Sequence, residues 1–272
     1  MDLSQNELNK MLESAVTAAR LAGKRAMEEL KHITMSVKYD SEVVTQADSI
    51  CQQIIIDYVK KVYPGHGFIA EECVGGKLFK QAPDEGQDFW WVIDPIDGTN
   101  NYAHGMLIFT VSVAVMSGGE PIVGAIYDPA TDSMYSAAKG SDARLNGRKI
   151  VVGEGGLDKF SSVSLDSNFG DSVPKWAQEI MVKTRYRNLG TTALHLAYVA
   201  NGGLVAALMP SAAKLWDIAA GVLIAKAAGA AVTNLEGKEL FPVDLQAYQG
   251  EGFKVLAANR TVHSEILAML NK

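Results

Sequence analysis

The sequence predicts a mixed α and β protein, with an α+β first half followed by an α/β second half. In residues 1–152, two segments with helical periodicity precede a series of strand-like segments joined by short turns. In residues 153–272, short apolar segments alternate with helical ones, as in α/β folds. A chain of 272 residues can bury the core of one large domain or of two smaller ones.

The elements of the first half follow in order. Apolar residues recur at helical spacing in residues 5–31 and again in residues 47–62, and residues 33–39 alternate like a strand. The stretch 75–86 is the most loop-like of the chain, and we expect either a mobile flap or a plain surface connection there. Residues 108–152 indicate β-hairpins, because Gly-rich and Asn-Gly turns separate their apolar runs.

The second half alternates strands and helices, and Gly229 falls where a helix C-terminus is expected. The predicted elements are strand 161–165, helix 174–183, strand 185–188, helix 191–201, strand 203–208, helix 216–228, strand 230–234, strand 253–258 and helix 261–271.

Composition excludes several classes of function. The net charge of -6, with no basic cluster, argues against a nucleic-acid or anionic-membrane partner. No apolar run is long enough to span a bilayer, and the polar N-terminus has no signal-peptide pattern. Cys51 and Cys73 form no Cys-x-x-Cys pair, so a cytoplasmic location is the simplest expectation. The chain also lacks a zinc motif, a Walker loop and a dinucleotide fingerprint.

The most informative segment is Asp94-Pro95-Ile96-Asp97-Gly98-Thr99, which follows the apolar run 89–93. The apolar run predicts a buried strand, and Pro95 stiffens the backbone between the two acids. Two aimed carboxylates followed by Gly-Thr suit Mg²⁺ bound together with a phosphate. The alternative is a polar turn that closes a core strand, since Asp-Pro and Asp-Gly are common in turns.

Three further acids bear on the function. Glu71, followed by Glu72, ends a second short apolar segment, and ligand sites in α/β folds lie at such strand ends. Asp217 is the single charge at the start of an apolar helix, where it could cap the helix or bind a metal. Asp48 stands three residues after Thr45, which matches a helix capping box.

Together these residues resemble the inositol monophosphatase family of Mg²⁺-dependent, lithium-sensitive sugar phosphatases. The resemblance extends over nearly the whole chain. It rests on the following motifs: Glu71-Glu72, Asp94 to Thr99, Trp216-Asp217-Ile218-Ala219-Ala220, Thr45-Gln46-Ala47-Asp48, and Asn188-Leu189-Gly190-Thr191-Thr192.

The resemblance implies a layered α-β-α-β-α sandwich in one compact domain, with the metal site between its halves. It also implies Mg²⁺ as cofactor, in two or three ions, and a homodimer. By resemblance, Glu71, Asp94 and the carbonyl of Ile96 hold one ion, and Asp94, Asp97 and Asp217 hold a second.

The family also implies the catalytic and substrate-binding residues. Glu71 and the pair formed by Thr99 and Asp48 would activate the attacking water, so the implied catalytic residues are Glu71, Thr99 and Asp48. The residues implied to bind the phosphorylated substrate are Asp97, Gly98, Thr99, Gly190, Thr191, Thr192 and Asp217. Helix N-termini bind phosphate well, because they present free N–H groups and a favourable dipole.

The resemblance favours hydrolysis of a small sugar or polyol phosphate, with myo-inositol 1-phosphate first. One departure from the family pattern bears on this. The family usually has a Glu seven residues before the Trp-Asp acid, where it contacts inositol hydroxyls, and this chain has Pro210. Fructose 1,6-bisphosphate, histidinol phosphate and 3′-phosphoadenosine 5′-phosphate therefore remain alternative substrates. A metal-binding regulator without activity is the non-enzymatic alternative, although every expected acid is present.

Overall fold

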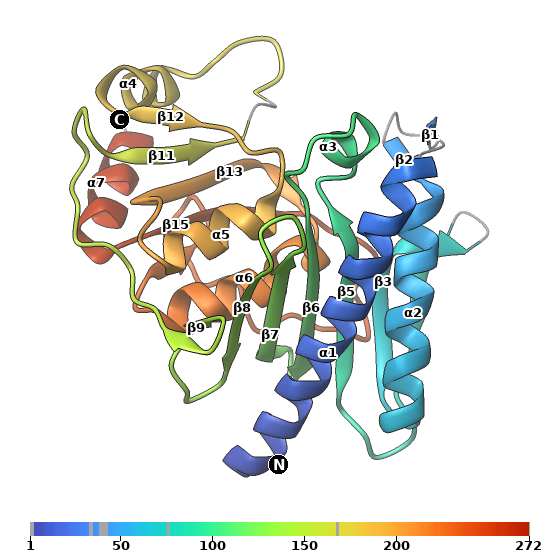
Figure 1. Ribbon diagram of the computed structural model, residues 1–272. Coiled ribbons are helices and arrows are strands. Elements are labelled where there is room, and N and C mark those ends of the chain that lie inside the picture. The colour runs from blue at the N-terminus through green and yellow to red at the C-terminus, as the bar shows by residue number, and fades with distance from the viewer. Residues whose placement is uncertain (1–2, 33–34, 38–42, 75–76, 167–168, 272) are drawn as a thin grey trace.

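The computed structural model describes residues 3–32, 35–37, 43–74, 77–166 and 169–271. Its helices and strands stack in five layers that alternate between α and β, and two helices separate the two sheets (Figure 1). The predicted α-β-α-β-α sandwich is thereby confirmed. No helix in the described ranges combines the length and the apolar character needed to cross a membrane.

The larger sheet has the strand order β10-β9-β8-β7-β6-β5-β3-β4. Its neighbouring strands are antiparallel except for β3 and β5, which pair in parallel. The bounds are β3 Gly67–Val74, β4 Lys77–Gln81, β5 Trp90–Asp97, β6 Thr110–Ser117, β7 Glu120–Asp128, β8 Ser133–Ala138, β9 Arg144–Leu145 and β10 Arg148–Lys149. A separate ribbon pairs β1 (Met35–Val37) with β2 (Val43–Thr45).

Helices α1 (Gln5–Glu29) and α2 (Gln46–Val62) lie side by side on the outer face of the larger sheet (Figure 1). Ser4 begins α1 with a capping box, in which Ser4 and Glu7 exchange hydrogen bonds. The inner face of α1 is lined by buried alanines, which let the helix approach the strands closely. A short turn of 3-10 helix, Leu30–His32, follows α1.

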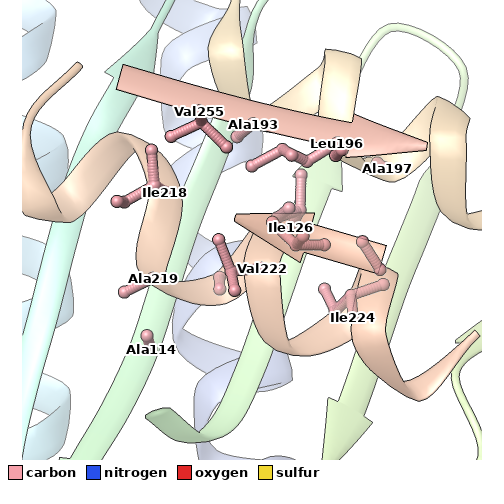
Figure 2. Packing of buried hydrophobic residues seen from close by; sticks show 14 of the residues in the cluster. Ala114, Ile126, Ala193, Leu196, Ala197, Ile218, Ala219, Val222, Ile224 and Val255 are labelled. Carbon is pink, nitrogen blue, oxygen red and sulfur yellow. The ribbon is translucent and has the colours of Figure 1, made fainter. Parts of the chain in front are cut away.

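The middle layer consists of α5 (Thr192–Ala200) and α6 (Leu215–Ala227), which are apolar on nearly every side because both faces are buried. Figure 2 shows Leu196 and Ala197 of α5 facing Val222 and Ile224 of α6, with strand residues around them. A Cβ at Gly221 would lie 2.6 Å from Leu196, so only glycine permits this helix contact.

The smaller sheet has the strand order β12-β11-β13-β15-β14. Its outer face is covered by α4 (Lys175–Lys183) and α7 (Arg260–Leu270), which share a separate apolar cluster with it. Its strands are β11 Ser162–Leu165, β12 Arg185–Arg187, β13 Ala206–Ala213, β14 Ala231–Thr233 and β15 Phe253–Ala258.

The prediction of a loop over residues 75–86 was wrong in part. Residues Lys77–Gln81 form β4, which pairs with β3 at the edge of the larger sheet. The glycines and the proline on either side predict a loop, although the segment contains a short apolar pair, Leu78-Phe79, between two lysines. Residues 75 and 76, the first two of the predicted loop, lie outside the described residues.

Most other predicted elements agree with the structure to within one or two residues. The exception is the strand predicted at 203–208, which begins later and continues to Ala213. The register of β13 shifts between Met209 and Ala213, because Pro210 has no N–H for the strand ladder. The strand predicted at 33–39 is observed as β1, and its remaining residues lie outside the described part of the chain.

Candidate active site

Glu71 and Asp94 lie next to each other because their strands pair in parallel. β3 and β5 are in register with Ala70 opposite Ile93, so the next residue on each strand is one of the two acids. The two carboxyl groups interact, because the charge of Glu71 adds to burial in raising the pKa of Asp94. The two predicted strand ends therefore do meet at one place.

The turn after Asp94 brings a backbone carbonyl to the same place. Oδ1 of Asp94 accepts a hydrogen bond from the amide of Ile96 at 3.0 Å, across Pro95. The carbonyl of Ile96 accepts a hydrogen bond from Oγ1 of Thr99 at 2.9 Å. A carboxyl group, a carbonyl and a hydroxyl thus lie within one turn at the end of β5.

Asp48 is both a helix cap and a member of the site. Its Oδ2 accepts hydrogen bonds from the amide and the hydroxyl of Thr45, at 2.8 and 2.6 Å, which caps α2. Its Oδ1 accepts a hydrogen bond from Oγ1 of Thr99 at 3.0 Å. Asp48 is completely buried, so these contacts fix its orientation.

Asp97 joins the larger sheet to helix α5. Its Oδ2 accepts a short hydrogen bond from Oγ1 of Thr191 and a second from the amide of Ala193 at 2.7 Å. Its Oδ1 lies 3.2 Å from the amide of Thr192. The positive end of the helix dipole favours a carboxylate at this position.

Asp217 lies in the first turn of α6, where its Oδ2 accepts the amide of Lys214 at 2.6 Å. The start of α6 is tied to the larger sheet, because the hydroxyl of Ser112 donates to the carbonyl of Trp216 at 3.1 Å. Ser112 stands opposite Asp94 in the pairing of β6 with β5. The sheet register therefore places the start of α6 at the level of the acids.

The pKa values show that these acids repel one another. Burial raises the pKa of both Glu71 and Asp94 well above the ordinary range, and the charge of Asp217 raises each further. Burial also raises the pKa of Asp97, to about 6, although hydrogen bonds from the start of α5 oppose the rise. Such a cluster favours binding of a cation.

The donor atoms fit Mg²⁺. They are carboxylate, carbonyl and hydroxyl oxygens, which are the ligands that hard divalent cations prefer. Oε2 of Glu71 is buried and has no hydrogen-bond partner, so it is available as a ligand. Across the described residues, however, no three His, Cys, Asp or Glu side chains form a group that could hold one ion.

The backbone segments predicted to bind phosphate also meet here. Gly98 has a φ of 97°, and a Cβ at this position would lie 3.2 Å from the carbonyl oxygen of Gly190. Asn101 bridges the two segments, because its Nδ2 donates to the carbonyls of Ile108 and Leu189 at 2.8 and 2.7 Å. The structure thus brings Gly98, Thr99, Gly190, Thr191 and Thr192 together around Asp97.

A cavity of about 180 Å³ adjoins Asp97, at the ends of β11 and β13. It is lined by Asp97, Asp166, Asn188, Gly190, Thr191, Thr192, His195 and Met209. A larger cavity of about 350 Å³ lies at the opposite end of β5, beside Trp90, and contains none of the predicted site residues. The smaller cavity is the relevant one, because it shares Asp97 with the acidic cluster.

Several residues of the site were missed by sequence reasoning. Gln52 lies one helical turn after Asp48, and its amide group exchanges two hydrogen bonds with the backbone of Glu72, at 2.8 and 2.9 Å. Its spacing from Asp48 on one helix face was the only signal available. His195 was expected to be a packed or surface residue rather than a ligand, and it is packed, with 3% of its surface exposed; it also lines the cavity. His104, which was assigned no chemistry, is exposed and contacts the carbonyl of Asn100.

The chain is similar to known proteins along nearly its whole length. The model of the inositol monophosphatase family matches residues 7–272. An inositol-1-monophosphatase of Mesorhizobium japonicum is 31% identical, over 97% of this chain and 96% of its own. The Nus factor SuhB of Vibrio cholerae is 34% identical, over 85% of this chain and 87% of its own. The solved structure of a Thermotoga maritima IMPase has a TM-score of 0.82 at 30% identity, covering 96% of this chain and 97% of that one.

The layered fold is that of the IMPase-type structures to which the chain is similar. The chain belongs to the inositol monophosphatase family. Membership in this family of phosphatases supports a phosphoric monoester hydrolase that acts on a small phosphorylated substrate. The names of the relatives differ, so they do not identify the substrate.

Proposed function

We propose that this protein is a Mg²⁺-dependent phosphomonoesterase that hydrolyses a small polyol phosphate, with myo-inositol 1-phosphate as the first candidate. The observation that carries the proposal is the placement of Glu71 and Asp94 directly after the last parallel pair of β3 and β5, where burial and the charge of Glu71 raise the pKa of Asp94. Two buried, mutually repelling carboxyl groups, one with an oxygen that has no partner, are stabilised by a divalent cation. Mg²⁺, when bound, lowers the pKa of water and neutralises charge on phosphate oxygens.

The ligands in this proposal are those implied by the family. Glu71, Asp94 and the carbonyl of Ile96 hold one ion, Asp94, Asp97 and Asp217 hold a second, and a third is weaker. Asp217 would have to release the amide of Lys214, or bind through its other carboxylate oxygen. We expect lithium and calcium to inhibit, as is typical of the family.

Thr99 and Asp48 orient the attacking water in this mechanism. The hydroxyl of Thr99 has one proton and two acceptors within reach, Oδ1 of Asp48 and the carbonyl of Ile96. When the carbonyl of Ile96 serves as a metal ligand, the proton goes to Asp48. A lone pair of Oγ1 then accepts a hydrogen bond from the water and directs its oxygen at phosphorus.

The phosphate would lie against the backbone amides of Gly98 and Thr99. Gly190, Thr191, Thr192 and Asp97 would contact the substrate from the start of α5. Most of the rate acceleration in such a site comes from positioning and electrostatic stabilisation, since little covalent chemistry is asked of the protein.

The test is phosphate release from four esters, each with Mg²⁺ and with EDTA. The esters are myo-inositol 1-phosphate, fructose 1,6-bisphosphate, histidinol phosphate and 3′-phosphoadenosine 5′-phosphate. We expect Mg²⁺-dependent release, fastest from myo-inositol 1-phosphate. Release that survives EDTA would overturn the metal-dependent mechanism. Tight Mg²⁺ binding without release from any ester would favour the binding or regulatory alternative.

Assembly and location are part of the proposal. We expect a homodimer, which sedimentation measurements on the purified protein would test. We also expect a cytoplasmic protein that binds neither nucleic acid nor membranes, as the net charge of -6 suggests.

A further inference from the structure

Asp97 and His195 line the same cavity, and one nitrogen of the His195 ring has no hydrogen-bond partner. Nε2 of His195 accepts a hydrogen bond from the amide of Leu189 at 2.9 Å. Burial lowers the pKa of His195 to about 4, so the ring is neutral near pH 7. A neutral imidazole whose Nε2 accepts must hold its proton on Nδ1. That N–H is buried and has no partner.

The other polar groups on the wall of this cavity suit hydroxyl groups. Asp166 contributes a carboxylate, and Asn188 contributes an amide whose Oδ1 accepts the N–H of Gly190 at 2.9 Å. Met209 adds apolar surface. Donors and acceptors on the same wall match hydroxyl groups, each of which donates and accepts.

The charge of the cavity argues against a second phosphate. Among the described residues that line it, none is a lysine or an arginine, and two are aspartates. A second phosphate group in this cavity would face the charge of the aspartates, with no lysine or arginine on the wall to pair with. The cavity of about 180 Å³ is therefore better suited to a small neutral polyol than to a bisphosphate.

We infer that His195 is a specificity-determining residue, whose Nδ1–H donates to a substrate hydroxyl, directly or through one water. The inference rests on the proposed phosphatase function and adds a residue that recognises the hydroxyl groups of the substrate. His195 occupies a different element from Pro210, at which the family's hydroxyl-binding acid is missing. The histidine thus supplies a polar contact that the sequence pattern alone did not predict.

The kinetic test compares two esters that share a six-membered ring. myo-Inositol 1-phosphate carries hydroxyl groups on that ring, and cyclohexyl phosphate carries none. The ratio is kcat/KM for myo-inositol 1-phosphate divided by kcat/KM for cyclohexyl phosphate. We expect His195→Leu to lower this ratio about tenfold, which corresponds to the loss of one hydrogen bond. His195→Gln retains an acceptor for Leu189 and a donor for the substrate, so it should restore most of the ratio.

The ratio separates recognition from structural damage. Loss of the contact between Leu189 and His195 would loosen the segment before α5 and slow both esters together, leaving the ratio constant. His263→Leu is the matched control. His263 is also a buried histidine, but its hydrogen-bond partner is Thr233, and neither residue lines the cavity. A ratio that His195→Leu leaves within about twofold of the parent protein would overturn the inference.

A binding readout keeps this inference separate from the proposed function. Isotope-edited NMR of the histidine rings reports which nitrogen of His195 is protonated. We expect the Nδ1–H signal to shift when myo-inositol 1-phosphate is added with Ca²⁺, and to shift less with inorganic phosphate and Ca²⁺. If the protein hydrolyses neither ester, the proposed function fails, and this signal still decides the role of His195. An unchanged signal with the inositol ester would overturn it.

Discussion

Oδ2 of Asp97 lies 2.7 Å from the amide nitrogen of Ala193, in the first turn of α5. The two residues are 96 positions apart in the chain, so this hydrogen bond connects the end of β5 to the middle helical layer. The same carboxylate binds Thr191 and Thr192. The residues predicted to contact phosphate therefore gather around one side chain.

This contact predicts that Asp97→Asn destabilises the protein as well as inactivating it. Asparagine has no charge for the amides at the start of α5 to stabilise. Its NH₂ group also cannot accept hydrogen bonds from those amides. We expect the free energy of unfolding to fall by about 1–3 kcal/mol. Urea denaturation in the presence of EDTA measures this without a contribution from bound metal.

Asp94→Asn is expected to abolish activity with the opposite effect on stability. The pKa of Asp94 is raised by burial and by the charge of Glu71, so its ionised form is unfavourable in the folded protein. Removing that charge should leave the fold intact and raise the unfolding midpoint in EDTA. Normal Mg²⁺-dependent turnover in this variant, or in Asp217→Asn, would contradict the metal assignment.

Substitutions at Thr99 test the orientation of water. Thr99→Ala removes the hydroxyl that links Asp48 to the carbonyl of Ile96, and kcat should fall about 100-fold. Thr99→Ser retains the hydroxyl and should remain within about tenfold of the parent protein. Equal losses in the two variants would argue that the methyl group, not the hydroxyl, matters.

Two glycines with nearly the same backbone conformation form a matched pair. Gly190 and Gly105 have φ values of 69° and 71°. A Cβ at Gly190 would lie 2.8 Å from Nδ2 of Asn101, whereas a Cβ at Gly105 meets nothing within 4 Å. Gly190→Ala should therefore lower activity and the unfolding midpoint more than Gly105→Ala, which reports the backbone strain alone. Thermal melts and turnover of both variants would show the difference.

His66 is expected to make the protein less stable in mild acid. Its Nδ1 accepts a hydrogen bond from the indole N–H of Trp91 at 3.0 Å, and burial lowers its pKa to about 4. The unfolded chain therefore binds the proton more tightly, so stability falls as pH drops from about 6.5 towards 4. His66→Gln retains an acceptor but does not titrate. Urea denaturation at about pH 7 and pH 5 should show a smaller loss in this variant, and an equal loss would refute the assignment.

Much of the fold could be predicted from sequence, because periodicity and turn residues act locally. The helical spacing of α1 and α2 and the turn at Asn146 and Gly147, both with positive φ, were all recognisable. β4 was not, since a short edge strand between glycines and a proline resembles a loop. The shift of β13 beyond Pro210 also escaped prediction, because strand pairing tolerates a bulge that composition does not reveal.

The sequence by itself determined which residues we propose for the chemistry. Carboxylates that interrupt or end apolar segments, as at Glu71, Asp94 and Asp217, are costly to bury, and that cost makes them recognisable without a structure. Only the tertiary structure decided which of these side chains lie together and which groups they contact. The parallel register of β3 and β5 places Glu71 beside Asp94, and the start of α5 binds Asp97. Such relationships join segments far apart in the chain, and strand register and helix packing are set by the whole core rather than by local sequence.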